Sequence, residues 1–290
     1  MTNTTDRSLK PRNQALKNGT LYVVATPIGN MKDISLRAID VLKAVDLVLC
    51  ENTFNSQKLL SNFAIHTKTK QFTDFSDDKY VDMLLDMLRK GQNIALISDA
   101  GTPMISDPGY KLIQAAQENA IFVTAIPGAS TITAIASISP IPMDKFYFYG
   151  FLPHTKEHLK NELRKMETLD CSIVFFESPR RVVDALNAII DVLGDRKIFL
   201  ARELTKLYEQ HYYGTASNVI GELATKEIKG EIAFVMEGAT ILTAITDADL
   251  KNLLSKMLTN MSIKDAVTEL SKEYKLPKKH VYNLALKVKE

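Results

Sequence analysis

Three carboxylates stand where predicted strands end, a position from which a side chain can remove a proton from a bound hydroxyl. Asp99 follows the apolar run Ile94–Ile97, and Glu177 and Glu203 follow two later runs of the same kind. A carboxylate acts as a general base when it lies within hydrogen-bond reach of the proton. Each of the three could instead cap a helix or form a structural ion pair. They are therefore candidates for a base or an orienting carboxylate, with no choice made among them.

Basic side chains cluster at the ends of the later predicted strands. They are Arg180, Arg181, Arg202 and Lys206. Solvation at the surface explains most arginines and lysines in proteins. The pair Arg180-Arg181 stands at a predicted helix start. Two adjacent guanidinium groups there favour phosphate binding over simple solvation at the surface.

Other kinds of site find little support in the sequence. His154 and His158 have i, i+4 spacing, but no nearby Cys or third His completes a metal site, and the polar segment around them favours a solvated helix face. Thr26–Asn30 contains one glycine where a dinucleotide-binding turn needs about three, and no Gly-Lys-Ser/Thr sequence is present. We therefore predict no metal site and disfavour a nicotinamide or P-loop site.

Asp99 belongs to a segment unusually rich in helix and strand breakers. Ser98–Gly109 contains two glycines, two prolines, two aspartates and two serines, which is too many for a helix or strand. A long loop of small residues at the carboxyl end of a strand is where open α/β sheets bind ligands. An ordinary strand-to-helix turn is the alternative. The length of the loop and its paired Ser-Asp steps favour a binding loop.

Strands and helices alternate through the first half of the chain. This pattern predicts a mainly parallel sheet covered on both faces. Three breaker-rich loops, at Pro27, at residues 99–109 and at residues 127–131, follow strands of the same direction, so they should meet at one edge of the sheet. Apolar periodicity predicts strands over 21–25, 46–51, 94–98 and 121–125, and helices over 35–44, 55–62, 80–89, 110–118 and 131–137.

The alternation restarts after a Pro-containing linker at residues 139–142. Here a short strand pair after Glu203 indicates a mixed sheet. Towards the C-terminus, Ser262 is placed to cap a helix through Tyr274, and Pro277 to open another through Val288. The fold class is thus α/β with two α/β domains and a small C-terminal helical extension. The predicted divisions are a disordered leader over 1–18, α/β domains over 19–138 and 143–240, and the helical extension over 245–290.

Composition excludes several classes of protein. The 290 residues are 46% hydrophobic and 24% charged, as in soluble globular proteins, and the net charge of +2 provides no global basic field. Cys50 and Cys171 are far apart and without metal-ligand spacing, which favours buried free thiols in a reducing compartment. No apolar run reaches membrane-spanning length. We expect a cytoplasmic protein.

Long ordered motifs carry a family resemblance from Leu21 to the end of the chain. The motifs are 21–30, 98–109, 126–130, 149–153, 175–181, 201–206, 229–231 and 276–282. Together they resemble the tetrapyrrole (corrin/porphyrin) methylase superfamily, and within it the 16S rRNA (cytidine-2′-O)-methyltransferase branch. The resemblance implies two α/β domains with S-adenosyl-L-methionine in the cleft between them. It also implies a homodimer that methylates a cytidine in the decoding region of 16S rRNA, as free RNA or in the small ribosomal subunit.

The resemblance also implies a cofactor site, residue by residue. Its expected members are Pro27, Ala100, Gly101, Thr102, Ile105, Ser130, Thr131, Glu177, Leu204, Thr205, Gly230, Glu231 and Ile232.

One motif departs from the family pattern. Where the family carries Glu-Asp-Thr-Arg, this chain has Glu51-Asn52-Thr53-Phe54, so an acid and an arginine are missing from the expected active-site edge. The residues expected to contact substrate are Glu51, Phe54, Arg180, Arg181, Arg202 and Lys206.

Two other functions remain open at this level. A methylase of the same fold could act on a tetrapyrrole, although Arg180-Arg181 and the Lys-bearing C-terminal helices favour RNA. A non-catalytic RNA-binding or ribosome-assembly factor is the second alternative, and only Asn52 and Phe54 favour it.

Overall fold

The computed structural model describes residues 18–224, 227–239, 246–274 and 276–289. The leader predicted for residues 1–18 lies outside the described residues apart from Asn18. The chain divides into two compact units, residues 1–165 with 171–237, and residues 166–170 with 238–290.

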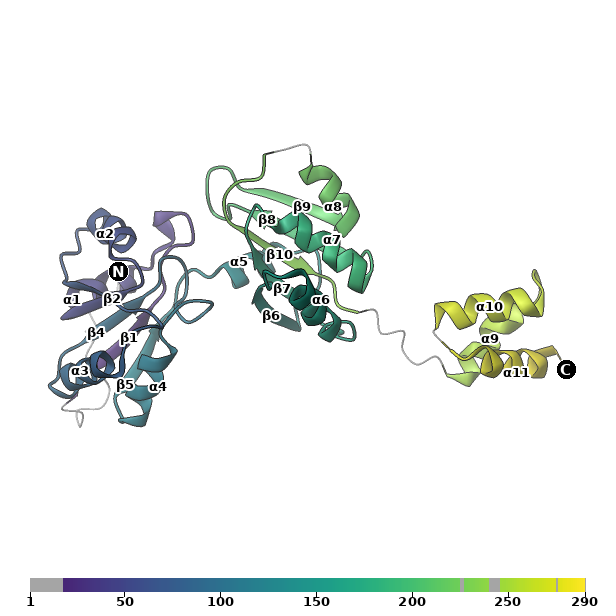
Figure 1. Ribbon diagram of the computed structural model, residues 1–290, viewed down its shortest axis with the longest axis horizontal. Helices are drawn as coiled ribbons and strands as arrows, with labels where there is room; N and C mark the ends of the chain where they lie inside the picture. Colours follow the sequence, from purple (N-terminus) through teal and green to yellow (C-terminus); the bar gives the residue numbers. More distant parts are fainter. Residues whose placement is uncertain (1–17, 225–226, 240–245, 275, 290) are drawn as a thin grey trace, which may run out of the picture. The chain divides into compact units, whose positions relative to one another are not determined.

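The first sheet is entirely parallel and has the strand order β3-β2-β4-β1-β5 (Figure 1). Because β4, β1 and β5 are neighbours, the three loops that follow them meet at one edge, as predicted. Backbone hydrogen bonds between Thr26 and Gly101 in both directions join two of these loops. The strands are β1 (Thr20–Val24), β2 (Leu47–Cys50), β3 (Thr69–Gln71), β4 (Ile94–Ile97) and β5 (Phe122–Ile126).

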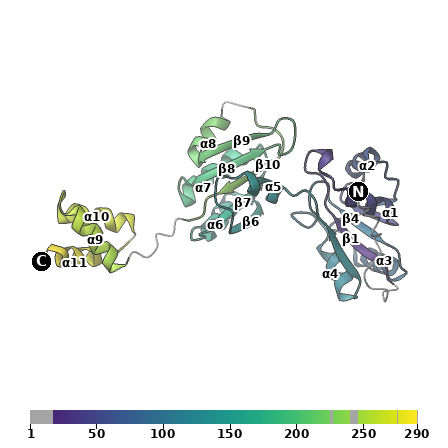
Figure 2. The same ribbon diagram turned by 180° about the vertical axis from the view of Figure 1, so that it is seen from behind.

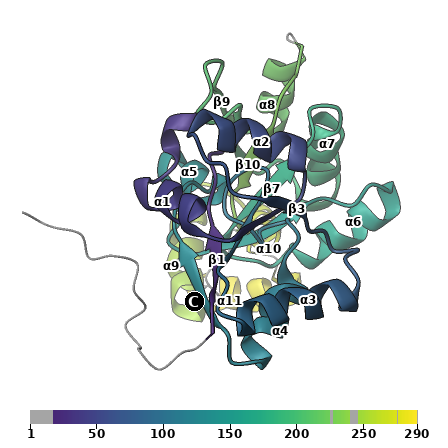
Figure 3. The same cartoon turned by 90° about the vertical axis from the view of Figure 1, so that its left-hand side faces the viewer.

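Two pairs of helices cover the two faces of this sheet (Figure 3). Helices α1 (Leu36–Ala44) and α2 (Thr53–Asn62) contribute apolar side chains to the core on one face. Helices α3 (Asp78–Arg89) and α4 (Tyr110–Glu118) do so on the other. The predicted covering of both faces is confirmed. A short 3₁₀ helix, η1 (Met31–Asp33), precedes α1.

The second sheet is mixed, with the order β6-β7-β10-β8-β9, and this prediction is also confirmed. Strands β6 and β7 are parallel, and the remaining neighbours are antiparallel. Helix α5 (Thr131–Ile138) packs on this sheet through the buried Ile135. The other elements are β6 (Phe146–Phe151), α6 (Lys156–Lys165), β7 (Ser172–Glu177), α7 (Val182–Leu193), β8 (Lys197–Arg202), β9 (Gln210–Thr215), α8 (Ala216–Leu223) and β10 (Ile232–Met236).

In the described part of the C-terminal unit there are three helices (Figure 2). Their buried apolar side chains form a core of their own. The helices are α9 (Asp247–Met257), α10 (Ile263–Glu273) and α11 (Lys278–Lys289). Ser262 caps α10, and α11 begins directly after Pro277, as predicted. Helix α9 was missed, although Thr246 caps it and the buried Leu250 and Leu254 repeat at helical spacing. Among the described residues, no helix is both long and apolar enough to cross a membrane.

Candidate functional site

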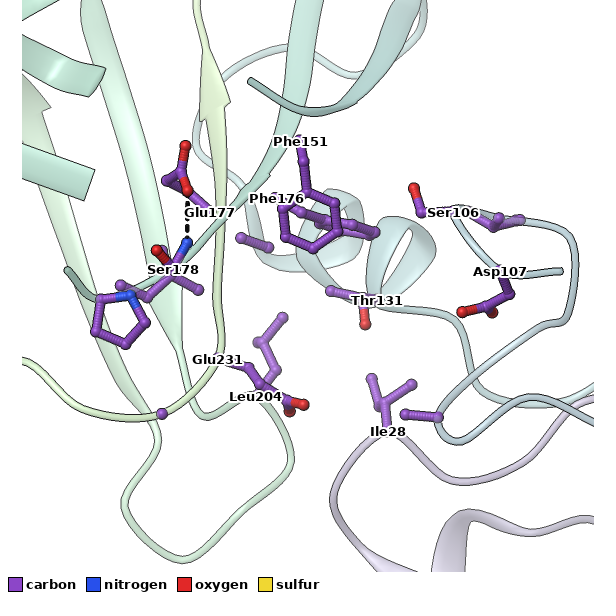
Figure 4. A pocket seen from close by; sticks show the side chains of 16 residues that line it. Ile28, Ser106, Asp107, Thr131, Phe151, Phe176, Glu177, Ser178, Leu204 and Glu231 are labelled. Atoms are coloured by element: carbon purple, nitrogen blue, oxygen red, sulfur yellow. Dashed lines mark hydrogen bonds between the residues drawn. The ribbon is translucent and has the colours of Figure 1, made fainter. Parts of the chain in front are cut away.

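A cavity of about 350 Å³ lies where loops of the first sheet face the second sheet (Figure 4). Its volume is within the range of small-molecule sites, roughly 300–1,000 Å³. The first sheet and α5 contribute Ile28, Ala100, Ile105, Ser106, Asp107 and Thr131. The second sheet contributes Phe151, Phe176, Glu177, Ser178, Pro179, Leu204, Gly230, Glu231, Ile232 and Ala233.

The loop after β4 reaches this cavity through an unusual backbone. Two of its residues, Met104 and Ser106, have left-handed φ angles of 76° and 65° although neither is glycine. Such conformations cost free energy and are concentrated at functional sites. The Thr102 hydroxyl donates to the Ala129 carbonyl at 3.1 Å, which ties the loop to the Pro-Gly-Ala-Ser turn. The breaker-rich sequence thus forms a specific, strained loop.

Close backbone approaches hold the two walls of the cavity together. A Cβ atom added at Gly29 would lie 2.6 Å from Lys206 Cγ and 2.8 Å from the Leu204 carbonyl oxygen. A Cβ atom at Gly150 would lie 3.3 Å from Ser106 Oγ. Any larger residue at Gly29 would therefore push the first wall away from the second.

Of the three candidate carboxylates, only Glu177 lines the cavity. Its side chain is fully buried, and Oε1 accepts a hydrogen bond from its neighbour's amide, Ser178 N, at 2.7 Å. Within the described part of the chain, Oε2 has no hydrogen-bond partner, and the Arg181 guanidinium lies 3.4 Å away. Arg181 also donates to the carbonyls of Leu152 and Pro153, so the protein itself already holds this guanidinium.

Glu203 is engaged in an ion-pair network beside the cavity. Its Oε1 accepts from Lys206 Nζ at 2.9 Å and from the amide of Glu231 at 3.0 Å. Partial burial acts to raise the pKa of Glu203, but these hydrogen bonds outweigh burial and lower it. A Cβ atom on Gly230 would lie 2.1 Å from the same Oε1. Glu203 therefore fixes the Gly230–Glu231 segment of the wall, and it is poorly placed to act as a base.

Asp99 also lies off the cavity, where it accepts a hydrogen bond from Asn55 Nδ2 at 2.8 Å. The carboxylate of this loop that does line the cavity is Asp107, which is not among the three candidates. Burial, then the negative charge of Glu51, raises the pKa of Asp107 to about 6, against a hydrogen bond from Ser98 that lowers it. The paired Ser-Asp steps were the available signal, and spacing alone did not show which aspartate turns inward.

The expected cofactor set divides into two groups. Those that line the cavity are Ala100, Ile105, Thr131, Glu177, Leu204, Gly230, Glu231 and Ile232. Those beside it in the chain but not in the lining are Pro27, Gly101, Thr102, Ser130 and Thr205. Sequence reasoning omitted the lining residues Ile28, Ser106, Asp107, Phe151, Phe176, Ser178, Pro179 and Ala233. The assignment of this set to a cofactor stays a prediction.

None of the expected substrate residues lines the cavity. Arg180 is exposed, and Arg202 has a buried Nε without a hydrogen-bond partner among the described residues. Burial raises the pKa of Glu51, and the nearby Asp99 and Asp74 act in the same direction. Their contact with substrate also stays a prediction.

The departure at residues 52 and 54 has a clear local structure. Asn52 caps α2, and its Oδ1 accepts from the amides of Phe54 at 3.0 Å and Asn55 at 3.4 Å. An aspartate would cap the helix in the same way. The Phe54 side chain is 70% exposed, and Lys58 Nζ lies 4.5 Å from the centre of its ring. The consequential change is therefore at Phe54, which presents an aromatic face to solvent.

If Phe54 contacts RNA, as the resemblance implies, Phe54→Ala should weaken RNA binding about tenfold, the amount expected for the loss of one stacked base. Phe54→Arg should bind RNA as tightly as wild type but with a stronger dependence on salt, because a phosphate contact releases a counterion. RNA affinity measured at several salt concentrations tests both. Phe122→Ala is the matched control, since Phe122 is an exposed phenylalanine at the start of β5, at the opposite edge of the sheet. Equal affinities for wild type and Phe54→Ala would show that Phe54 does not contact RNA.

Residues 20–220 match the family model described as Tetrapyrrole (Corrin/Porphyrin) Methylases, and residues 244–289 match the RsmI C-terminal HTH domain. The fold agrees with solved structures. A cobalt precorrin-4 methyltransferase has a TM-score of 0.54 at 16% identity, covering 79% of this chain and 98% of that one. A diphthine synthase has a TM-score of 0.56 at 14% identity, covering 75% and 89%. The chain belongs to the tetrapyrrole methylase family, and its methyl donor is S-adenosyl-L-methionine.

Curated relatives narrow this assignment. The ribosomal RNA small subunit methyltransferase I of Rickettsia prowazekii is 37% identical over 278 residues, covering 94% of this chain and 98% of the relative. The protein of the same name from Thermotoga maritima is 39% identical over 220 residues, covering 76% and 99%. Within the superfamily, the chain is a methyltransferase of the ribosomal RNA small subunit methyltransferase I family.

Proposed function

We propose that this protein uses S-adenosyl-L-methionine to methylate the ribose 2′-hydroxyl of a cytidine in the decoding region of 16S rRNA. The observation that carries the proposal is the 37% identity to the Rickettsia prowazekii relative over nearly its whole length. The cavity supports it, because carboxylates and apolar side chains from both sheets converge there. The proposal includes a homodimer that acts in the cytoplasm on 16S rRNA or on the small subunit.

The cavity fits the methyl donor on the chemistry of its lining. S-adenosyl-L-methionine carries an ammonium and a sulfonium, and the buried Glu177 Oε2 has no hydrogen-bond partner among the described residues. The apolar side chains of Ile105, Leu204 and Ile232 suit its adenosyl group. Gly230 keeps the opposite wall open, since a side chain there would collide with Glu203. We assign the donor to these residues.

The donor, when bound, supplies an electrophilic methyl group. The protein must then exclude water, orient the ribose and accept the hydroxyl proton. Asp107 is the best placed acceptor, because it lines the cavity and its pKa of about 6 leaves it ionised near neutral pH. Glu177, buried and already bonded to Ser178 N, is better suited to holding positive charge.

We expect Ala100→Arg to abolish measurable S-adenosyl-L-methionine binding, because it brings a long cationic side chain to the cavity against a cationic ligand. Ala100 is exposed on a loop, so the substitution should leave the melting temperature nearly unchanged. Calorimetric titration measures the affinity, and Ala224→Arg, at an exposed helix end, is the control. Unchanged affinity in Ala100→Arg would remove this loop from the donor site.

The proposed function is tested by mass mapping of rRNA fragments from cells with and without the protein. We expect one 2′-O-methylated cytidine of the decoding region to be lost without it, and to be restored in vitro by the purified protein. Retention of the modification, with a spectral shift on adding a tetrapyrrole, would favour the small-molecule methylase. Tight rRNA binding without methyl transfer would favour the assembly factor.

A further inference from the structure

Phe151 combines two features that rarely occur together. It lines the cavity, yet 57% of its side chain is exposed. One edge is supported, since its ring lies 5.6 Å from that of Phe176 at an interplanar angle of 65°. Phe176 in turn packs against Phe148 at 5.0 Å and 63°. A phenylalanine is thus held in place by an aromatic row while much of its surface stays open.

A β-bulge determines which way Phe151 faces. Phe148 pairs with Val174 and Phe151 pairs with Phe176, although the first two are three residues apart and their partners only two. Because side chains alternate along a strand, the extra residue brings Phe151 to the same face as Phe148 and Phe176. Without the bulge it would face the other side of the sheet. Gly150, with φ of +85°, adopts the left-handed backbone there. The chain therefore bends specifically to present this ring beside Phe176.

We propose that Phe151 is the surface on which the nucleobase of the methylated nucleotide stacks. This inference rests on the proposed function and identifies how that site would recognise its substrate. Sequence-specific recognition of RNA mostly targets single-stranded nucleotides, whose unstacked bases lie on aromatic side chains. An open aromatic face at a cavity that also contains a carboxylate provides this arrangement.

The position of Phe151 favours the substrate base over the adenine of the donor. Figure 4 shows Phe151 and Phe176 together, apart from Leu204, one of the apolar side chains assigned to the adenosyl group of the donor. Asp107, the proposed proton acceptor, comes from the other wall. A base stacked on Phe151 would leave its ribose in the same cavity as this carboxylate. Adenine and a substrate base share their stacking chemistry, so the experiment must separate them.

The test compares Phe151→Leu, which keeps an apolar side chain but loses the aromatic face, with Phe151→Tyr, which keeps the ring. The probe is an rRNA fragment with 2-aminopurine at the mapped methylation position, bound to the full-length protein. We expect the probe to brighten on binding wild type and Phe151→Tyr, because its base leaves the RNA stack, and Phe151→Leu to lose this change, with a rise in KM for RNA of roughly tenfold. The Kd for S-adenosyl-L-methionine should stay unchanged. Phe146→Leu, on the same strand but outside the cavity lining, is the control.

Two results for the variants would overturn the proposal. A loss of S-adenosyl-L-methionine affinity in Phe151→Leu would place the donor's adenine on this ring. An unchanged fluorescence response and KM in Phe151→Leu would make Phe151 a packing residue. If the wild type fails to methylate rRNA, the proposed function fails and the stacking proposal falls with it. Failure of the wild type is measured without any variant, so it can be distinguished from the two results for Phe151→Leu.

Discussion

Asp107→Asn is expected to lower kcat by about 10²- to 10⁴-fold, the usual contribution of a positioned general base. The amide keeps the size of the side chain but cannot accept a proton. Binding of S-adenosyl-L-methionine should persist, because the substitution removes no apolar lining residue. Single-turnover methylation of rRNA with saturating donor measures the effect. Asp74→Asn, which removes a charge near Glu51 but does not line the cavity, should leave kcat unchanged.

The pH dependence gives this prediction a second measurement. Since burial and the charge of Glu51 raise the pKa of Asp107 to about 6, the wild-type rate should rise as the pH increases through about 6. Asp107→Asn should lose this rise.

The contribution of Asp107 to folding stability should fall as the pH rises, whereas the rate of methylation should increase. A carboxyl whose pKa is raised in the folded state favours folding most below its ordinary value of 3.8, and this contribution is lost as the pH rises through about 6. Asp107→Asn should therefore melt at a higher temperature than wild type at pH 8. Full activity in this variant, with an unchanged pH profile, would exclude Asp107 as the base.

Removal of residues 246–290 is expected to reduce rRNA methylation at low RNA concentration by about a hundredfold while leaving the Kd for S-adenosyl-L-methionine unchanged. The three C-terminal helices have their own core and belong to a unit that excludes both sheets, so their removal should leave the fold of the sheets intact. Helix α11 carries Lys278, Lys279 and Lys287 and contains no Asp or Glu, a composition suited to phosphates. A hundredfold loss corresponds to about 2.7 kcal/mol of binding free energy.

Two further measurements test whether the lysines of α11 cause this loss: a variant that changes only their charge, and RNA affinity at several salt concentrations. Lys278→Glu with Lys279→Glu should reproduce most of the loss in an intact protein. The full-length protein should also show the steeper salt dependence, by about 0.7 in the logarithmic slope for each phosphate contact with single-stranded RNA. The Thermotoga maritima relative leaves about a quarter of this chain without a counterpart, so the dependence must be measured directly. A full rate in the truncated protein would show that the unit does not dock RNA.

Local rules were enough to predict most elements of this protein from its sequence. Helix α10 begins after Ser262, the cap that the sequence predicts. Buried strands such as β4 were predicted from short apolar runs. The exceptions have local causes as well. Strand β3, Thr-Lys-Gln, lies at the edge of its sheet and is polar, so it lacks an apolar pattern.

The sequence by itself also determined that three loops meet at one sheet edge, because the carboxyl ends of parallel strands always share an edge. The roles of the individual side chains depended on the tertiary structure. It decided that Asp107 lines the cavity and Asp99 does not, and that Arg181 is held by carbonyls of another loop. Segments far apart in the chain set each of these outcomes, because they supply the charges and carbonyl groups around these side chains. Spacing along the sequence contains no record of those neighbours, because the segments that supply them meet only when the chain folds.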